Sequence, residues 1–222
     1  MTMTTNALLP LIIDELAYAF KSAPEFSYPF KHWEVLNVLP EELTDQILAV
    51  RIPRTEGFSY DGTRASDSQV RPGGTPPRRM FIDKTTKEAY PFFQDLVDAL
   101  LSQPVIDVVN NKFGLDTAGL YLRVEYINDF DGFFLDPHKD IVEKRFSMLL
   151  FLGEGPEHMG TDFYDADLKV VKTVSFKHNN AYVFLPGDDT WHGLEKKSIP
   201  DRRCSLLINY VTFKTDFPVP LR

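Results

Sequence analysis

The second half of the chain, after Gly119, is a series of short apolar segments separated by clusters of turn-forming residues. Segments of this length, rich in aromatic and β-branched residues, are typical of β-strands, and no helical pattern lies between them. Short strands that follow one another without helices pack as a sandwich or jelly roll. The sequence therefore predicts a mainly β core over residues 119–222, with strands at 120–126, 146–152, 170–176, 181–185 and 205–213.

The first half, residues 1–118, favours helices. Its apolar residues recur at helical spacing, and Pro40 followed by two glutamates is typical of a helix start. Between the predicted elements, residues 53–79 are rich in Gly, Pro and Ser and form a predicted long loop. We expect one α+β domain over residues 1–222, because a chain of this length can bury one core. Helices are predicted at 14–21, from Pro40 onward, at 88–101 and at 105–113, with a strand at 32–36.

Composition limits the classes of partner. The formal net charge is −8, whereas general nucleic-acid binding requires an excess of Lys and Arg. The apolar runs are too short to span a bilayer. Cys204 is the single cysteine, so no internal disulfide can form and a reducing cytoplasm is the simplest location. We expect no nucleic-acid or membrane partner, and the sequence does not specify the oligomeric state.

The segment 136–140 contains a His-x-Asp pattern, formed by His138 and Asp140. Residues two apart on an extended chain point to the same side, so both can bind one metal. A further histidine, His192, follows the turn at 186–190. Two histidines and one carboxylate on one side of Fe(II) leave positions open for a cosubstrate and oxygen. The pattern also fits a loop histidine beside a solvated aspartate.

Shortly after His192, the sequence Arg203-Cys204-Ser205-Leu206 begins a predicted strand. Alternation places Arg203 and Ser205 on one face, with Cys204 facing the core. A guanidinium pairs with a carboxylate through two hydrogen bonds, and a neighbouring hydroxyl adds another. The distal carboxylate of 2-oxoglutarate requires such a pair. The remaining histidines are predicted at surface or turn positions and not as metal ligands; they include His32, His158 and His178.

Residues 121–213 resemble the 2-oxoglutarate and Fe(II)-dependent oxygenase superfamily, close to its prolyl-hydroxylase-like branch. The matching residues are Tyr126, Gly132-Phe133-Phe134, the His-x-Asp pattern, Gly160-Thr161-Asp162-Phe163, His192-Gly193 and Arg203-Cys204-Ser205-Leu206. The resemblance implies a double-stranded β-helix, a form of jelly roll, flanked by the N-terminal helices.

The same resemblance implies the cofactors and the reaction. His138, Asp140 and His192 would hold Fe(II), while Arg203, Ser205 and Tyr126 would bind 2-oxoglutarate. Oxygen would be the second cosubstrate and ascorbate a candidate reductant. The implied activity is hydroxylation of a small-molecule or peptide substrate, coupled to conversion of 2-oxoglutarate into succinate.

Two other functions fit the metal pattern. A cupin-like isomerase or hydrolase would use the same ligands without 2-oxoglutarate and would not need Arg203. In a non-catalytic ligand-binding jelly roll, the same three residues would contact a ligand. The predicted loop is locally basic, which fits either a solvated loop or a lid that selects an anionic substrate; its arginines are Arg51, Arg54, Arg64, Arg71, Arg78 and Arg79.

Overall fold

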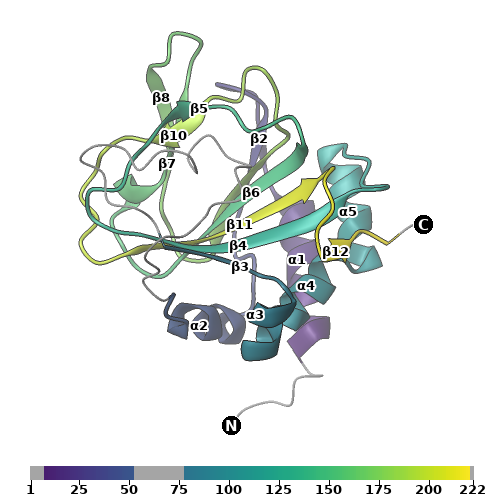
Figure 1. Ribbon diagram of the computed structural model, residues 1–222. Coiled ribbons are helices and arrows are strands. Elements are labelled where there is room, and N and C mark those ends of the chain that lie inside the picture. The colour runs from purple at the N-terminus through teal and green to yellow at the C-terminus, as the bar shows by residue number, and fades with distance from the viewer. Residues whose placement is uncertain (1–7, 53–77, 221–222) are drawn as a thin grey trace.

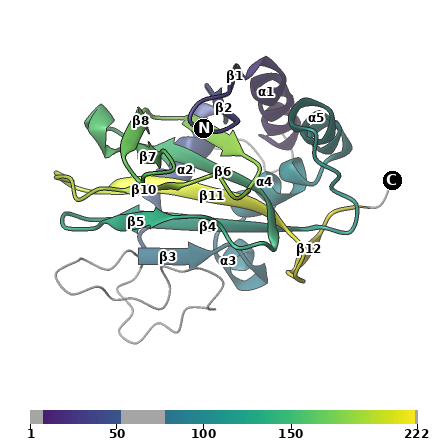
Figure 2. The ribbon, with the colours of Figure 1, turned by 90° about the horizontal axis from the view of Figure 1, so that it is seen from above.

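The computed structural model describes residues 8–52 and 78–220, which form helices and two antiparallel sheets (Figure 1). In the larger sheet the strand order is β1-β2-β9-β6-β11-β4-β12, and β3 pairs with β4. Figure 2 shows β6, β11, β4 and β3 side by side. The strands of this sheet are β1 Glu25–Phe26, β2 His32–Val35, β3 Arg78–Phe81, β4 Tyr121–Asp129, β6 Lys144–Leu152, β9 Asn180–Phe184, β11 Arg203–Val211 and β12 Phe217–Pro218.

The smaller sheet has the order β5-β10-β7-β8. Its strands are β5 Leu135–His138, β7 Thr161–Tyr164, β8 Val170–Val174 and β10 His192–Leu194. A hydrophobic cluster joins the two sheets, because it contains Leu149 and Phe184 from the larger sheet together with Phe163 and Leu194 from the smaller one. The space between the sheets is therefore one interior of the protein.

The helices cover the other face of the larger sheet (Figure 1). Leu122 and Val124 of β4 and Leu206 and Ile208 of β11 belong to the cluster that contains the apolar sides of α1, α4 and α5. Strand alternation thus gives β4 and β11 one helix-facing side and one side that faces the smaller sheet. The helices are α1 Leu8–Ser22, α2 Glu41–Ala49, α3 Lys84–Ala89, α4 Phe92–Leu100 and α5 Gln103–Phe113, with a 3₁₀ turn, η1, at Glu157–Met159.

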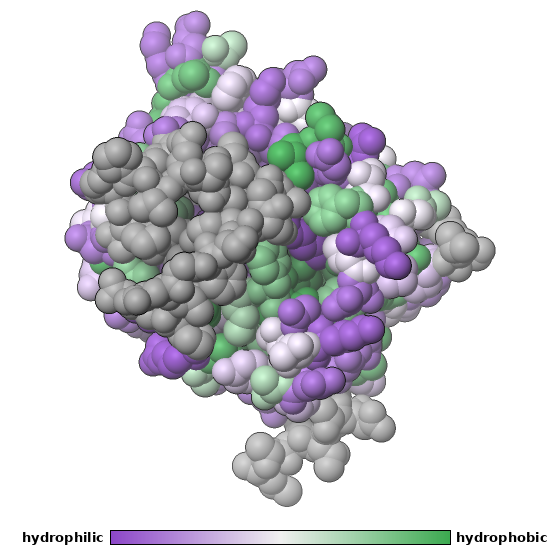
Figure 3. Space-filling model, in the orientation of Figure 1, coloured by the Kyte–Doolittle hydropathy of each residue, from purple (hydrophilic) through white to green (hydrophobic). Residues whose placement is uncertain are grey.

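On the face shown in Figure 3, hydrophilic residues cover most of the coloured surface, and apolar residues gather mainly in one hollow. No helix among the described residues has the length and apolar character needed to cross a membrane.

The predicted mixture of helices and a mainly β core is confirmed, the strands pair antiparallel, and each of the six predicted strands overlaps an observed one. The helix predicted at 88–101 is divided into α3 and α4 at Pro91, which lacks the N–H that a continuous helix would need. The long loop was predicted to extend to residue 79, but Arg78 and Arg79 begin β3, where they pair with β4. The rest of that prediction falls on residues 53–77, outside the described part of the chain.

Candidate metal centre

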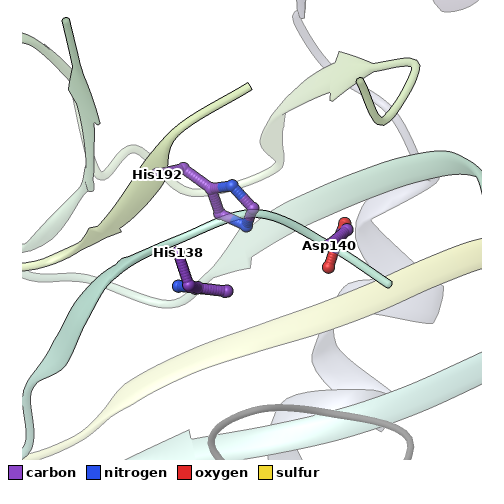
Figure 4. A group of neighbouring side chains, drawn as sticks. All are labelled: His138, Asp140 and His192. Carbon is purple, nitrogen blue, oxygen red and sulfur yellow. The ribbon is translucent and has the colours of Figure 1, made fainter. Parts of the chain in front are cut away.

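Neighbouring strands of the smaller sheet bring two predicted metal ligands together. His138 ends β5 and His192 begins β10, and the two residues are cross-strand partners. Their ring centroids are 4.3 Å apart. Asp140 lies beyond the end of β5. The prediction that strand alternation places it beside His138 is therefore wrong, because the two residues do not share a strand. One donor atom from each of the three side chains nevertheless lies within 4.8 Å of the others (Figure 4).

Hydrogen bonds orient both imidazole rings. Nδ1 of His138 lies 2.9 Å from the carbonyl oxygen of Asp136, and Nδ1 of His192 lies 2.9 Å from that of Thr190. Because a carbonyl oxygen only accepts, each Nδ1 carries a proton, and Nε2 of the neutral ring then carries the lone pair. Burial lowers the pKa of His192, although the negative charge of Asp140 opposes this effect. The lowered pKa favours the neutral form of the ring. Metal-binding histidines are typically oriented in this way.

Asp140 supplies a buried negative charge. Its Oδ1 accepts a hydrogen bond from the Lys144 ammonium at 2.5 Å, whereas Oδ2 is buried and has no hydrogen-bond partner among the described residues. Burial by itself would raise the pKa of Asp140, but the positive charge of Lys144 and its hydrogen bond hold that pKa below its usual range. An ionised carboxylate with an unpartnered oxygen, beside two lone-pair nitrogens, fits a bound divalent cation.

Gly193 allows β10 to lie close to β5. A Cβ at this position would lie 2.5 Å from the carbonyl oxygen of Leu135 and 3.0 Å from that of Asp136. The Asp136 carbonyl is also the one that accepts the Nδ1–H of His138. A side chain on residue 193 would therefore displace the segment that orients the ring of His138, one of the candidate metal ligands.

We predict that Gly193→Ala weakens metal binding and destabilises the protein by about 1–3 kcal/mol, the usual cost of overpacking an interior. Thermal unfolding measures the second effect, and equilibrium titration with Mn(II) measures the first. Gly119→Ala is the matched control, because a Cβ at Gly119 meets no atom within 4 Å. Its positive φ of 75° should cost stability without changing metal affinity. Equal metal affinities for wild type and Gly193→Ala would contradict the proposed role.

Arg203 lies in the same pocket as the three ligands. Its guanidinium is buried and donates three hydrogen bonds: Nε to the Met159 carbonyl at 2.5 Å, Nη1 to Asp129 Oδ2 at 2.7 Å and Nη2 to Thr161 Oγ1 at 3.2 Å. A guanidinium carries five N–H groups, so it retains capacity to bind a further carboxylate.

Ser205 also lines the pocket, as strand alternation predicts, and its buried Oγ has no hydrogen-bond partner within the described residues. Cys204 faces the helix side of the sheet, as predicted. Arg202 points elsewhere and donates to the carbonyl oxygen of Leu48 at 2.8 Å.

Tyr126 is not brought to the pocket. It belongs to the helix-facing side of β4, where it packs with Val124 and Leu206. Burial raises the pKa of its hydroxyl, which lies beside Cys204 and Asn128. The residues of β4 that line the pocket have the opposite phase and are Ile127 and Asp129. This orientation does not agree with the predicted contact between Tyr126 and 2-oxoglutarate.

The pocket is also lined by polar residues that the sequence did not indicate, among them Tyr182, Asp129 and Lys144. Tyr182 is buried on β9, and this burial raises its pKa. The sequence could have indicated Asp129, because a charged residue at the end of an apolar strand is a recognisable sign of a functional position. Nothing in the sequence distinguished Tyr182 from the apolar residues around it.

His32 lies in the interior, so its predicted surface or turn position is wrong. It is fully buried in β2, and its Nδ1 lies 2.8 Å from the carbonyl oxygen of Phe30. Its ring packs edge-on against Phe163, a favourable arrangement that stabilises the imidazole in this buried position. His158 and His178 lie at exposed positions, as predicted.

No protein-family model matches the chain, and no curated protein matches it. Solved structures do match. A Pseudomonas putida prolyl-4-hydroxylase has a TM-score of 0.57 at 19% identity, over 93% of this chain and 100% of that one. A Trichoplax adhaerens prolyl hydroxylase, solved with a peptide fragment of the hypoxia inducible factor oxygen degradation domain, has a TM-score of 0.58 at 13% identity, over 94% and 90%. The chain has the fold of the prolyl hydroxylases.

Prolyl-hydroxylase folds also occur among enzymes with other activities. The non-haem alpha-ketoglutarate-dependent epimerase SnoN from nogalamycin biosynthesis has a TM-score of 0.52 at 14% identity, over 91% of this chain and 84% of that one. At these identities the likeness concerns the fold, and the resemblance predicted from the sequence is confirmed at that level.

Proposed function

We propose that this chain is an Fe(II)- and 2-oxoglutarate-dependent oxygenase, with one catalytic domain over residues 1–222 whose two sheets form a double-stranded β-helix. One observation carries the proposal: the His138, Asp140 and His192 group and the buried cation of Arg203 line the same pocket. A cupin-like isomerase or hydrolase would need the metal ligands alone. A metal site with a carboxylate-binding group in the same pocket favours a metal-chelating cosubstrate with a second, distal carboxylate.

His138, Asp140 and His192 would hold Fe(II) through two imidazole nitrogens and one carboxylate oxygen. When bound, iron and 2-oxoglutarate would supply the oxidative chemistry, in which oxygen is consumed, succinate and CO₂ are formed, and a substrate is hydroxylated. Arg203 and Ser205 would orient 2-oxoglutarate by binding its distal carboxylate. Phe133, Leu135, Leu149 and Leu207 line the pocket and would limit the entry of water.

The proposed substrate is a small molecule or a peptide. The peptide complex of the Trichoplax enzyme supports the second class by fold analogy, and the arginines predicted to select an anionic substrate include Arg79, which lines the pocket. Ascorbate is the proposed reductant. A single cysteine, Cys204, is the basis for proposing a cytoplasmic location.

We expect a visible metal-to-ligand charge-transfer band when Fe(II) and 2-oxoglutarate are both added to the apoprotein without oxygen. Neither component should produce the band separately. Admitting oxygen should then bleach the band and release succinate, slowly in the absence of substrate. A folded protein that binds Fe(II) but shows no band with 2-oxoglutarate would favour the cupin-like alternative. Failure to bind Fe(II) would favour a non-catalytic ligand-binding protein.

A further inference from the structure

Lys144 is a buried cation that contacts the candidate metal site. It begins β6, its side chain is 3% exposed, and its Nζ lies 2.5 Å from Oδ1 of Asp140. It also lines the pocket that contains the three ligands. A metal on the other oxygen of Asp140 would share one carboxylate with this ammonium.

The backbone around Lys144 is firmly held, so the ammonium is not on a freely moving segment. Its amide N lies 3.1 Å from the carbonyl oxygen of Ile141, which closes the turn between Asp140 and β6. The amide of Thr212, just after β11, donates to the carbonyl oxygen of Glu143 at 2.9 Å. The turn that carries the Asp140 and Lys144 pair is therefore attached to the end of the central strand β11.

We infer that Lys144 is a positioning residue that presents Oδ2 of Asp140 to the metal and whose positive charge makes tight metal binding depend on an anionic cosubstrate. The first part follows from the hydrogen bonds, because Oδ1 is occupied by the ammonium and Oδ2 is unpartnered in the described structure. The second part rests on the proposed function, since it assumes that 2-oxoglutarate binds as a dianion.

Two effects of Lys144 on the metal oppose each other. The charge-assisted hydrogen bond holds the carboxylate in place, which favours metal binding. The ammonium repels a divalent cation a few ångströms away, and in a buried site this repulsion is weakly screened and doubled by the charge of the metal. We therefore expect repulsion to dominate in the absence of an anion. Binding of dianionic 2-oxoglutarate next to Lys144 would compensate that repulsion.

The test is titration with Mn(II), a redox-stable probe whose free form is counted by electron paramagnetic resonance, with and without 2-oxoglutarate. Without 2-oxoglutarate, Lys144→Met should bind Mn(II) about tenfold or more tightly than wild type. The factor by which 2-oxoglutarate tightens Mn(II) binding should fall by a similar amount. Lys144→Arg, which keeps the charge, should retain most of the wild-type coupling. Thermal unfolding checks that each variant is folded.

Lys139→Met is the matched control. Lys139 also lines the pocket and stands between two ligands in sequence, but its Nζ faces the exposed Asp188 at 3.7 Å and the ring of Trp191. Its removal should change Mn(II) affinity much less than removal of Lys144.

Unchanged or weaker Mn(II) binding by folded Lys144→Met would overturn the inference that the charge of Lys144 opposes metal binding. So would release of a proton by wild type but not by Lys144→Met on Mn(II) binding, because the lysine would then have given up its charge. A wild type whose Mn(II) affinity does not respond to 2-oxoglutarate would instead argue against the proposed function. The difference between wild type and Lys144→Met without 2-oxoglutarate would still test the electrostatic role by itself.

Discussion

Replacement of His192 by alanine is expected to reduce Fe(II) affinity by at least about a hundredfold, because it removes one of three protein ligands from a site that can tolerate little loss. His192 is buried opposite His138, and no other histidine among the described residues belongs to the ligand group. The side chain lies at the start of the short strand β10, so the larger sheet should remain folded. Iron content after anaerobic reconstitution and circular dichroism measure the two outcomes.

His138→Ala and Asp140→Ala should give the same result, since each removes one donor of the set. His178→Ala is the matched control because His178 is exposed and contacts the amide of Gly153 and the Thr44 hydroxyl, both outside the ligand group. Wild-type iron content in any one of the three ligand variants would remove that residue from the metal site.

Arg203→Ala is expected to weaken 2-oxoglutarate binding by a few hundredfold or more, with a much smaller effect on Fe(II). Loss of one partner from a buried charge pair costs about 3–5 kcal/mol, and that range corresponds to such a change in affinity. Isothermal titration of the Mn(II)-loaded protein with 2-oxoglutarate measures the effect without turnover.

Arg203 also has a structural role that the experiment must separate. Its loss leaves the buried Asp129 without the ion pair at 2.7 Å, so the unfolding temperature should fall as well. Affinity is therefore measured well below that temperature. Arg202→Ala is the control, because its guanidinium binds the carbonyl oxygen of Leu48 outside the pocket. If Arg202→Ala proved the more damaging change, Arg203 would not be the carboxylate-binding residue.

Strand alternation predicted one side of the pocket correctly, whereas the family resemblance selected a residue that lies on the opposite face of the sheet. In β11 the predicted phase placed Arg203 and Ser205 on one face, and both line the pocket. In β4, the resemblance selected Tyr126, whose phase places it against the helices. A motif identifies a residue type near a position, whereas only pairing with the neighbouring strands fixes which face that residue occupies.

The short strands β5, β7 and β10 were not predicted, although they carry or support two of the proposed metal ligands. Strands of three or four residues have too little periodicity to be recognised, and long-range pairing stabilises them. Asp140 and Lys144 are also separated by four residues, a spacing that is informative for helices but not for a turn that leads into a strand. Their contact depends on the tertiary fold.

The strands at the two ends of the pocket differ in how extensively they pair with their neighbours. β11, which carries Arg203, pairs with β4 on one side and β6 on the other along nearly its full length. His138 and His192 lie on strands β5 and β10, which are much shorter and share a pairing with an irregular register. Local opening requires least free energy where few backbone bonds must break. Subglobal fluctuations should therefore open the strands that carry the proposed metal ligands while β11 stays native, so we expect a bound metal to be lost early and reversibly during unfolding.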